Sequence, residues 1–387
     1  MIEIICFILL SSTIFIAYLS IFSNIKLSNK LGNIILILIA VIFIVFSTFF
    51  KPKSFIRWDL IEHFKLIDNM RIGGLHYAKI ESQYADLYVY NYFAYFISLL
   101  PKNYQNFLTV IPLIIDFSIV GYIYRKMFNN YLPATNGKVR VLSLMLWLFT
   151  FGIKLAISGI RCSLAVSIAT LAIYLEMIQN KHKLFSIFLY LIAVFIHNFA
   201  IVVIIVRLLT LLKKPVVIVC LSLTISIFLE PIARFIINNV NNQYLVFSFR
   251  RVLETIKEMN LSIAIKQYNS LTLIIYMCFF ILSIYLLVIS TKANQANCEN
   301  KYCKNVIRFA STVGTVAIGL SFNYLYLERF MYLISFALLM IVPIHNNDKN
   351  GIKNENLIIV PMSLFLFFFN DIYIFMVNYL ENYFLAF

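Results

Sequence analysis

The stretch Ser158-Gly159-Ile160-Arg161-Cys162-Ser163-Leu164-Ala165 places a glycine and a permanently charged arginine between two long apolar runs. Those runs, Val141 to Ile157 and Cys162 to Gln179, are long enough to cross the apolar core of a bilayer, which is roughly 30 Å thick, as helices. An arginine at a membrane boundary is costly to keep, so it marks a site for an anion or a paired acid. We therefore expect Arg161 to lie at the centre of a functional site.

The composition extends this pattern to the whole chain. Of its 387 residues, 62% are hydrophobic and 13% are charged, and the apolar residues fall in many separate blocks. A soluble fold cannot bury so many blocks. We predict an all-α bundle of eleven or twelve transmembrane helices that forms a single domain over residues 1–387. The uncharged run from Ile4 to Ile25 is too long for a signal peptide, so it is expected to remain as a span.

Apolar run lengths set the predicted spans. The twelve runs are Ile4 to Ser23, Gly32 to Phe50, Phe107 to Tyr124, Val141 to Ile157, Cys162 to Gln179, Leu184 to Ile196, Ala200 to Leu212, Pro215 to Glu230, Ser270 to Ser290, Arg308 to Leu327, Phe330 to His345 and Leu357 to Leu380. If the chain has eleven spans instead of twelve, Leu184 to Leu212 forms one long helix. The lysines before and after it favour a hairpin of two short helices broken near His197.

Lys and Arg outnumber Asp and Glu by 32 to 17, and most of them lie in short loops between spans. The excess therefore indicates membrane orientation rather than nucleic-acid binding. The positive-inside rule places both termini and the two longest polar segments, residues 51–105 and 231–269, outside the cell. Within the first segment, the tyrosine-rich run Tyr84 to Leu100 is expected to form a helix on the outer face, because tyrosine prefers the headgroup level.

In this topology the ionisable residues outside the predicted cytoplasmic loops gather on one face. They are Arg57, Asp59, Arg161, His197, Arg234, Arg250, Arg251, Glu328 and Arg329, with Glu328 and Arg329 expected in a turn between two spans. Asp116 and Lys154 are predicted to form an intramembrane pair. His63, His76, His182 and His345 are expected to face solvent. The six cysteines are scattered mainly through spans, so we expect neither a disulfide framework nor a metal site.

Several short motifs in this order resemble the EpsG family of bacterial polysaccharide polymerases, which is related to the Wzy-type O-antigen and capsule polymerases. They are Arg57-Trp58-Asp59, Gly159-Ile160-Arg161, Lys181-His182-Lys183, Phe195-Ile196-His197-Asn198 and Glu328-Arg329-Phe330-Met331-Tyr332. The family's first loop usually has Arg, a few residues and then Gly-x-Asp. Here only Trp58 separates Arg57 from Asp59.

The resemblance implies a glycosyltransferase in the bacterial plasma membrane that moves a growing glycan from undecaprenyl diphosphate to a lipid-linked repeat unit. Arginines suit this reaction because their charged fork stabilises a departing diphosphate. Arg161 and Arg329 are expected in that role, with Arg57, Arg250 and Tyr88 as further substrate contacts. Either His197 or Asp59 would position or deprotonate the acceptor hydroxyl. No cofactor or metal is expected, and a chain-length regulator and a flippase are expected partners.

Two other function classes stay open. A flippase or transporter of lipid-linked oligosaccharide would show paired helical repeats and charges along a central path, and neither pattern is visible here. A ligase that hands finished glycan to an acceptor uses the same type of donor. Each motif also has a structural interpretation: Arg161 as a snorkelling residue, His197 as a helix cap, Arg57 and Asp59 as a surface pair, and the tyrosine run as an interface belt.

Overall fold

In the part of the chain that it describes, the computed structural model contains helices joined by turns and short irregular segments, and no strands. The described residues are 2–22, 28, 30–51, 59–81, 87–152, 156–157, 159–212, 215–241, 246, 249–250, 253, 270–295, 300–320, 324–346 and 354–368. The α-helices are α1 (Ile2–Phe22), α2 (Leu31–Phe49), α3 (Asp59–His76), α4 (Tyr88–Ser98), α5 (Phe107–Lys126), α6 (Gly137–Phe151), α8 (Ile160–Ile173), α9 (Lys183–Ile196), α10 (Phe199–Leu209), α11 (Pro215–Asn239), α14 (Ser270–Gln295), α15 (Lys301–Gly319), α16 (Tyr324–His345) and α17 (Asn354–Leu366). Shorter turns are η1 (Tyr77–Glu81), η2 (Lys102–Tyr104), η3 (Met127–Tyr131) and η4 (Tyr174–Ile178).

Each of the twelve predicted spans overlaps a helix, and within the described part of the chain five stretches are long and apolar enough to cross a membrane by themselves. These are Leu31–Phe49, Lys102–Tyr131, Ile160–Ile178, Ile274–Asn294 and Leu327–His345. A sixth candidate is a pair of segments of α11, Pro215–Ile225 and Glu230–Asn239, bent by 57°. Other apolar helices, such as α9 and α10, are shorter. The chain is a multi-pass membrane protein with an all-α fold.

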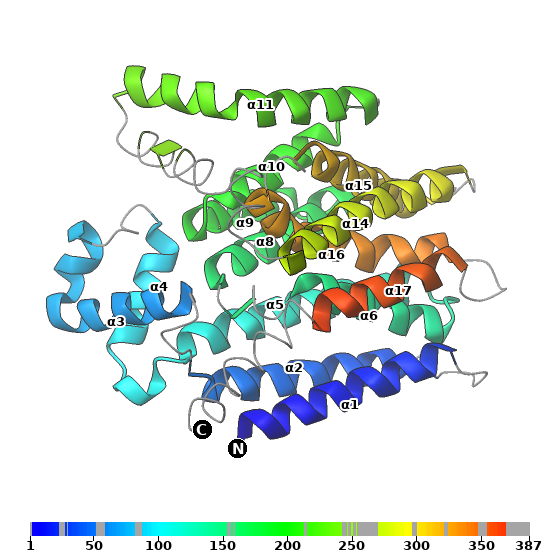
Figure 1. Ribbon diagram of the computed structural model, residues 1–387, viewed down its shortest axis with the longest axis horizontal. Helices are drawn as coiled ribbons and strands as arrows, with labels where there is room; N and C mark the ends of the chain where they lie inside the picture. Colours follow the sequence, from blue (N-terminus) through cyan, green and yellow to red (C-terminus); the bar gives the residue numbers. More distant parts are fainter. Residues whose placement is uncertain are drawn as a thin grey trace.

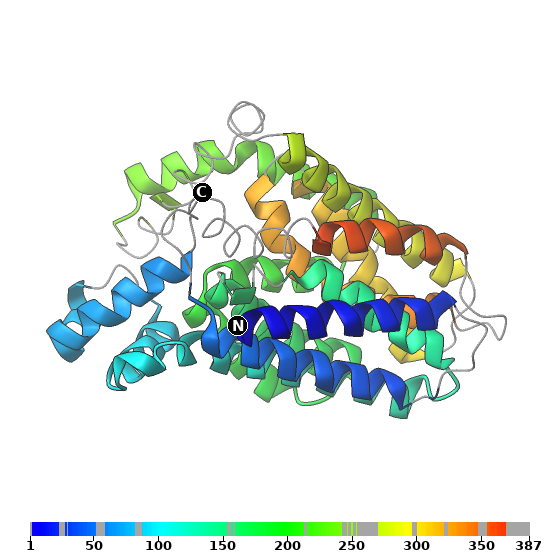
Figure 2. The same ribbon diagram turned by 60° about the horizontal axis from the view of Figure 1, so that its bottom comes forward.

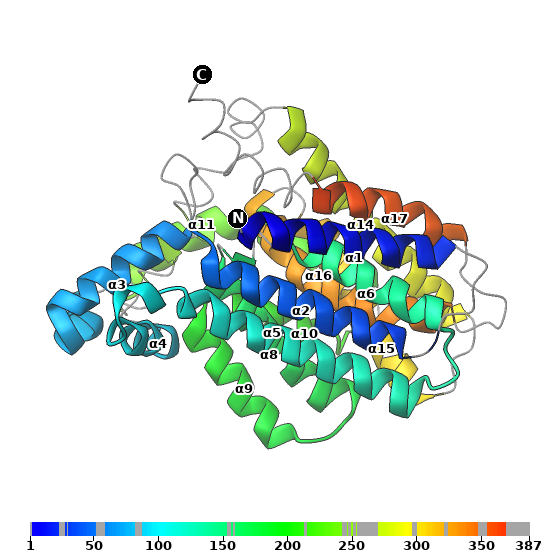
Figure 3. The same cartoon turned by 90° about the horizontal axis from the view of Figure 1, so that it is seen from below.

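The bundle is built around α6, α8 and α16, whose side chains are buried almost throughout. Helices α1, α2 and α5 pack side by side along one flank (Figure 3). The outward sides of α1 and α2 expose large apolar residues, for example Ile16, Ile37 and Leu38. Apolar side chains exposed in such numbers are stable only against lipid, so these faces match the predicted membrane contact.

Helices α3 and α4 lie together at one end of the bundle, which we call the α3/α4 end (Figure 1). Figure 2 shows both helices extending past the start of α1. Gly74 lets the chain bend out of α3 because its φ of 61° lies in the left-handed region that favours glycine. The predicted outer-face helix Tyr84 to Leu100 corresponds to α4, whose 11 residues are too few to span a bilayer.

One predicted boundary is wrong. The run Arg308 to Leu327 was expected to be a single span followed by a turn at Glu328 and Arg329, but α15 ends at Gly319 and α16 already begins at Tyr324. Glu328 and Arg329 therefore lie inside α16. The run is apolar on both sides of the true break, so its composition gives no signal there. At the end of α15, Gly319 packs closely against α11, where a side chain in its place would collide with Ser222.

Candidate functional site

Arg161 lies in the first turn of α8, directly after Gly159 and Ile160. Its side chain is partly buried, and its guanidinium carbon stands 5.2 Å from the centre of the Tyr90 ring of α4. A positive charge in the first turn of a helix is opposed by the helix dipole. The same dipole attracts anions. Arg161 is thus placed where it costs stability and where it would reinforce the binding of a negatively charged group.

Tyr90 is in turn hydrogen-bonded to His63 of α3. The Tyr90 hydroxyl and Nδ1 of His63 are 2.8 Å apart, and the two rings meet edge to face with centroids 5.4 Å apart. Both side chains are 1% exposed, so the expectation that His63 faces solvent was wrong. Burial, and then the nearby charge of Arg161, hold the pKa of His63 well below its ordinary value. His63 is therefore neutral at physiological pH.

Four of the predicted ionisable groups gather around Cys162, the residue after Arg161. The charges of Arg329, Arg161, Glu328 and Asp59 all act on its thiol. These groups come from three helices, α3, α8 and α16, that are widely separated in sequence. Arg161 and Arg329 consequently lie at the same end of the bundle, next to α3 and α4.

Arg329 stands out within this group. It is partly exposed, one turn into α16, and no hydrogen bond or ion pair joins it to another residue of the described chain. Its neighbour Glu328 is buried with 9% of its surface exposed. An arginine near the end of a membrane helix is expected to find a partner. The arrangement leaves Arg329 able to bind an external anion through its fork of N–H donors.

His197 occupies the break between α9 and α10, where the sequence predicted a hairpin. Its Nδ1 accepts the backbone N–H of Phe199 at 3.0 Å, so the imidazole acts as a cap for the start of α10. This hydrogen bond requires an unprotonated Nδ1, which assigns the remaining ring proton to Nε2. In this state His197 can offer a hydrogen bond from Nε2 but has no vacant nitrogen with which to take a proton.

The other predicted site residues are exposed or lie outside the described residues. Asp59 is exposed in the first turn of α3, and Tyr88 is exposed on α4, where its ring lies 5.6 Å from that of Phe195, close in sequence to His197. Arg250 is exposed. Arg57 lies outside the described residues, as does Lys154, the predicted partner of Asp116. Asp116 itself is buried in α5 against the hydroxyl-bearing residues Ser163 and Ser167.

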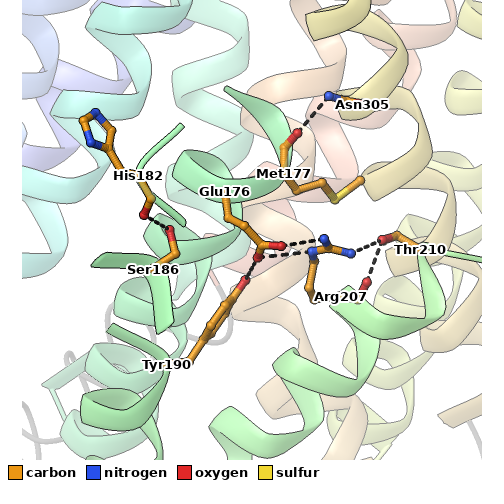
Figure 4. Close-up of polar contacts among 8 residues, drawn as sticks. All are labelled: Glu176, Met177, His182, Ser186, Tyr190, Arg207, Thr210 and Asn305. Atoms are coloured by element: carbon orange, nitrogen blue, oxygen red, sulfur yellow. Dashed lines mark hydrogen bonds and ion pairs between the residues drawn. The ribbon is translucent and has the colours of Figure 1, made fainter. Parts of the chain in front are cut away.

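A second polar cluster, which the sequence did not indicate, lies fifteen residues after Arg161, about 22 Å further along a helix. Figure 4 shows Arg207 of α10 forming two contacts with the carboxylate of Glu176, at 2.6 Å and 3.3 Å. Tyr190 of α9 donates a hydrogen bond to the same carboxylate at 3.1 Å. Three neighbouring helical elements are thereby joined at the end opposite Arg161. We call these three residues the Glu176 clamp.

In the described part of the chain, no three His, Cys, Asp or Glu residues are grouped so as to hold a metal ion.

Comparison with known proteins gives one informative result: the family model described as "EpsG family" matches residues 60–385, which is most of the chain. No curated protein and no solved structure matches significantly.

Proposed function

Because this chain belongs to the EpsG family, we propose that it is a Wzy-type polysaccharide polymerase. It would transfer a growing glycan from undecaprenyl diphosphate to a lipid-linked repeat unit at the outer face of the bacterial plasma membrane, as part of capsule, exopolysaccharide or O-antigen synthesis. The observation that carries the proposal is the gathering of Arg161, Arg329 and Asp59 around Cys162 at the α3/α4 end.

In the proposed reaction, the bond between the anomeric carbon of the donor glycan and its diphosphate breaks, and the acceptor hydroxyl oxygen forms the new bond. Negative charge develops on the departing diphosphate. Arg161 and Arg329 would meet this charge with preorganised N–H donors, in surroundings where water does not screen them fully. The N-terminus of α8 adds its partial positive charge on the same side.

The hydroxyl that attacks must lose a proton. Asp59 is an exposed carboxylate whose charge acts on the same Cys162 thiol as those of the arginines, and it is the group we assign as general base. His197 is less suited to that role because its Nδ1 already accepts the Phe199 N–H. Its Nε2 proton instead suits a hydrogen bond to a sugar oxygen. We propose this division for a choice that the residue types alone leave open.

The sugar rings would lie along the exposed side of α4. Tyr88 presents an aromatic face there, and such faces pack against the C–H surfaces of pyranoses. Arg57 and Arg250 remain predicted substrate contacts. A chain-length regulator and a flippase are the proposed protein partners, and the bilayer supplies the lipid carrier.

Replacing Arg161 tests this function directly. Arg161→Lys keeps the charge but loses the fork, so we expect a chromosomal deletion strain complemented with it to lose long glycan chains and to accumulate single repeat units. Loss of one charged contact to a transition state costs about 100-fold or more in rate. Gel analysis of extracted glycan, with immunoblotting of membranes, would measure both polymer and protein level.

Arg125→Lys is the matched control, because Arg125 is an exposed arginine in the last turn of α5, and it should leave polymer unchanged. Normal polymer in the Arg161→Lys strain would overturn the proposal. The deletion strain separates the alternatives. Lipid-linked single repeats should reach the outer leaflet if the chain is the polymerase. They would stay inside if it is the flippase, and unattached polymer would accumulate if it is a ligase.

A further inference from the structure

We propose that Tyr90 and His63 are positioning residues of this site, which fix the guanidinium of Arg161 in the orientation that receives the diphosphate. The inference rests on the proposed function and adds to it two residues, both on elements outside the membrane-spanning helices.

The geometry forms a continuous series of contacts. His63 is buried on α3 and holds the hydroxyl of Tyr90 at 2.8 Å, and the Tyr90 ring in turn supports Arg161 from α8 at 5.2 Å. Both aromatic groups are buried, so neither can turn to water. The ring that supports Arg161 is therefore held at two points, by packing within α4 and by its hydroxyl.

Support by an aromatic ring suits a phosphate-binding arginine for a physical reason. The guanidinium carbon of Arg161 lies over the Tyr90 ring, and a cation–π contact uses the charge of the guanidinium, whereas its N–H groups form the fork that binds phosphate oxygens. Tyr90 can thus orient Arg161 without taking up its N–H donors.

The position of α4 links this support to the rest of the site. Tyr90 contacts Arg161 at the start of α8, and Tyr88, two residues earlier, contacts Phe195 near the end of α9. The single helix α4 therefore touches both α8, which carries Arg161, and α9, which ends just before His197. Its own position against α3 is fixed in part by the hydrogen bond between His63 and Tyr90.

The charge state of His63 matters for this arrangement. On the elements packed against α3, the titratable or charged groups with described side chains are the tyrosines of α4 and Tyr77 and Lys79 of η1, while Asp59 lies one turn before His63 on α3 itself. The charge that acts on His63 most directly is that of Arg161. Protonation of His63 would place a second buried positive charge beside Arg161, and the repulsion would displace the guanidinium.

The test measures polymer formation by isolated membranes supplied with lipid-linked repeat units extracted from the deletion strain. Tyr90→Leu removes the aromatic face and should lower the rate by on the order of tenfold at unchanged membrane level. Tyr90→Phe keeps the face and loses only the hydroxyl, so it should retain most activity. Tyr88→Leu, on the exposed side of the same helix, controls for general disturbance of α4 and should leave the response of the rate to pH unaltered.

The dependence of the polymerisation rate on pH distinguishes a positioning role from a purely structural one, because a purely structural role would not change it. The wild-type rate should fall on acidification as His63 becomes protonated, and His63→Gln, which cannot gain a charge, should remove that acidic limb. If Tyr90→Leu fails to reach the membrane, the activity of Tyr90→Phe and the pH profile of His63→Gln still test the positioning role.

The outcomes separate the two proposals. A wild-type rate for Tyr90→Leu, or an unchanged acidic limb in His63→Gln, overturns the positioning role. If Arg161→Lys is inactive in the same assay, the proposed polymerase function survives that result. An active Arg161→Lys enzyme overturns the function itself, whatever Tyr90 and His63 do.

Discussion

At the residue scale, the sequence identified Arg161 because a charge beside long apolar runs is costly, and that argument needs no tertiary information. His63 and Tyr90 were not recognised, although a signal for His63 was available. The buried residues of α3 are Leu60, His63, Leu66, Ile67 and Met70, which follow helical spacing and place His63 on the apolar stripe. What the sequence cannot provide is the partner, because the contacts with Tyr90 and Arg161 join three separate helices.

The lowered pKa of His63 gives a stability prediction with a definite sign. Above pH of about 6.5 the ring is neutral in both the folded and the unfolded protein. Below that pH the unfolded chain binds the proton first, so the free energy of unfolding falls as the pH falls towards the lowered folded-state pKa. We expect the melting temperature of purified protein to drop more between pH 7 and pH 5 for the wild type than for His63→Gln.

Differential scanning fluorimetry in detergent at several pH values would measure this. His76→Gln serves as the control, since His76 is exposed on the same helix and should follow the wild type. Parallel curves for the wild type and His63→Gln would mean that His63 does not carry the effect.

At the scale of helices, the sequence located nearly every element because apolar length is a strong signal. It also predicted the hairpin of α9 and α10, where lysines flank a break at His197. It missed the break between α15 and α16, where hydropathy does not change. The close packing of α15 is also hidden from the sequence: at Gly314 a side chain would approach backbone atoms of Ser283 and Leu287 in α14 to 3.1 Å. Such contacts depend on the neighbouring helix, so the local hydropathy of the sequence does not reveal them.

The Glu176 clamp gives a prediction at this scale. The side chains of Arg207 and Glu176 are 18% and 22% exposed, so removing one partner leaves a poorly hydrated charge. We expect Arg207→Met to cost about 2 to 4 kcal/mol of stability, and Glu176→Gln combined with Arg207→Met to cost less than the sum of the single changes. Melting temperatures of the purified variants would show both effects.

The exposed pair Glu62 and Lys65 of α3 is the matched control. Its side chains are 57% and 64% exposed, and Lys65→Met should change stability by less than about 0.5 kcal/mol. An Arg207→Met protein as stable as the wild type would show that the clamp does not hold the three helices together.

At the scale of the whole molecule, the sequence predicted a helical membrane bundle with its ionisable groups at one end. The structure confirms the fold class and brings Arg161, Arg329, Glu328 and Asp59 to one end. The count of eleven or twelve spans follows from apolar runs alone, whereas five helices meet the length and polarity expected of a full crossing. Short helices such as α10, with 11 residues, need neighbours to shield their ends, and run length cannot reveal this.

The central claim is that two arginines far apart in sequence hold one lipid-borne diphosphate. Cryo-electron microscopy of the purified protein with an undecaprenyl diphosphate-linked repeat unit tests it most directly. We predict diphosphate oxygens within hydrogen-bond distance of both Arg161 and Arg329 at the α3/α4 end. A diphosphate bound elsewhere, or in contact with neither arginine, would contradict the claim.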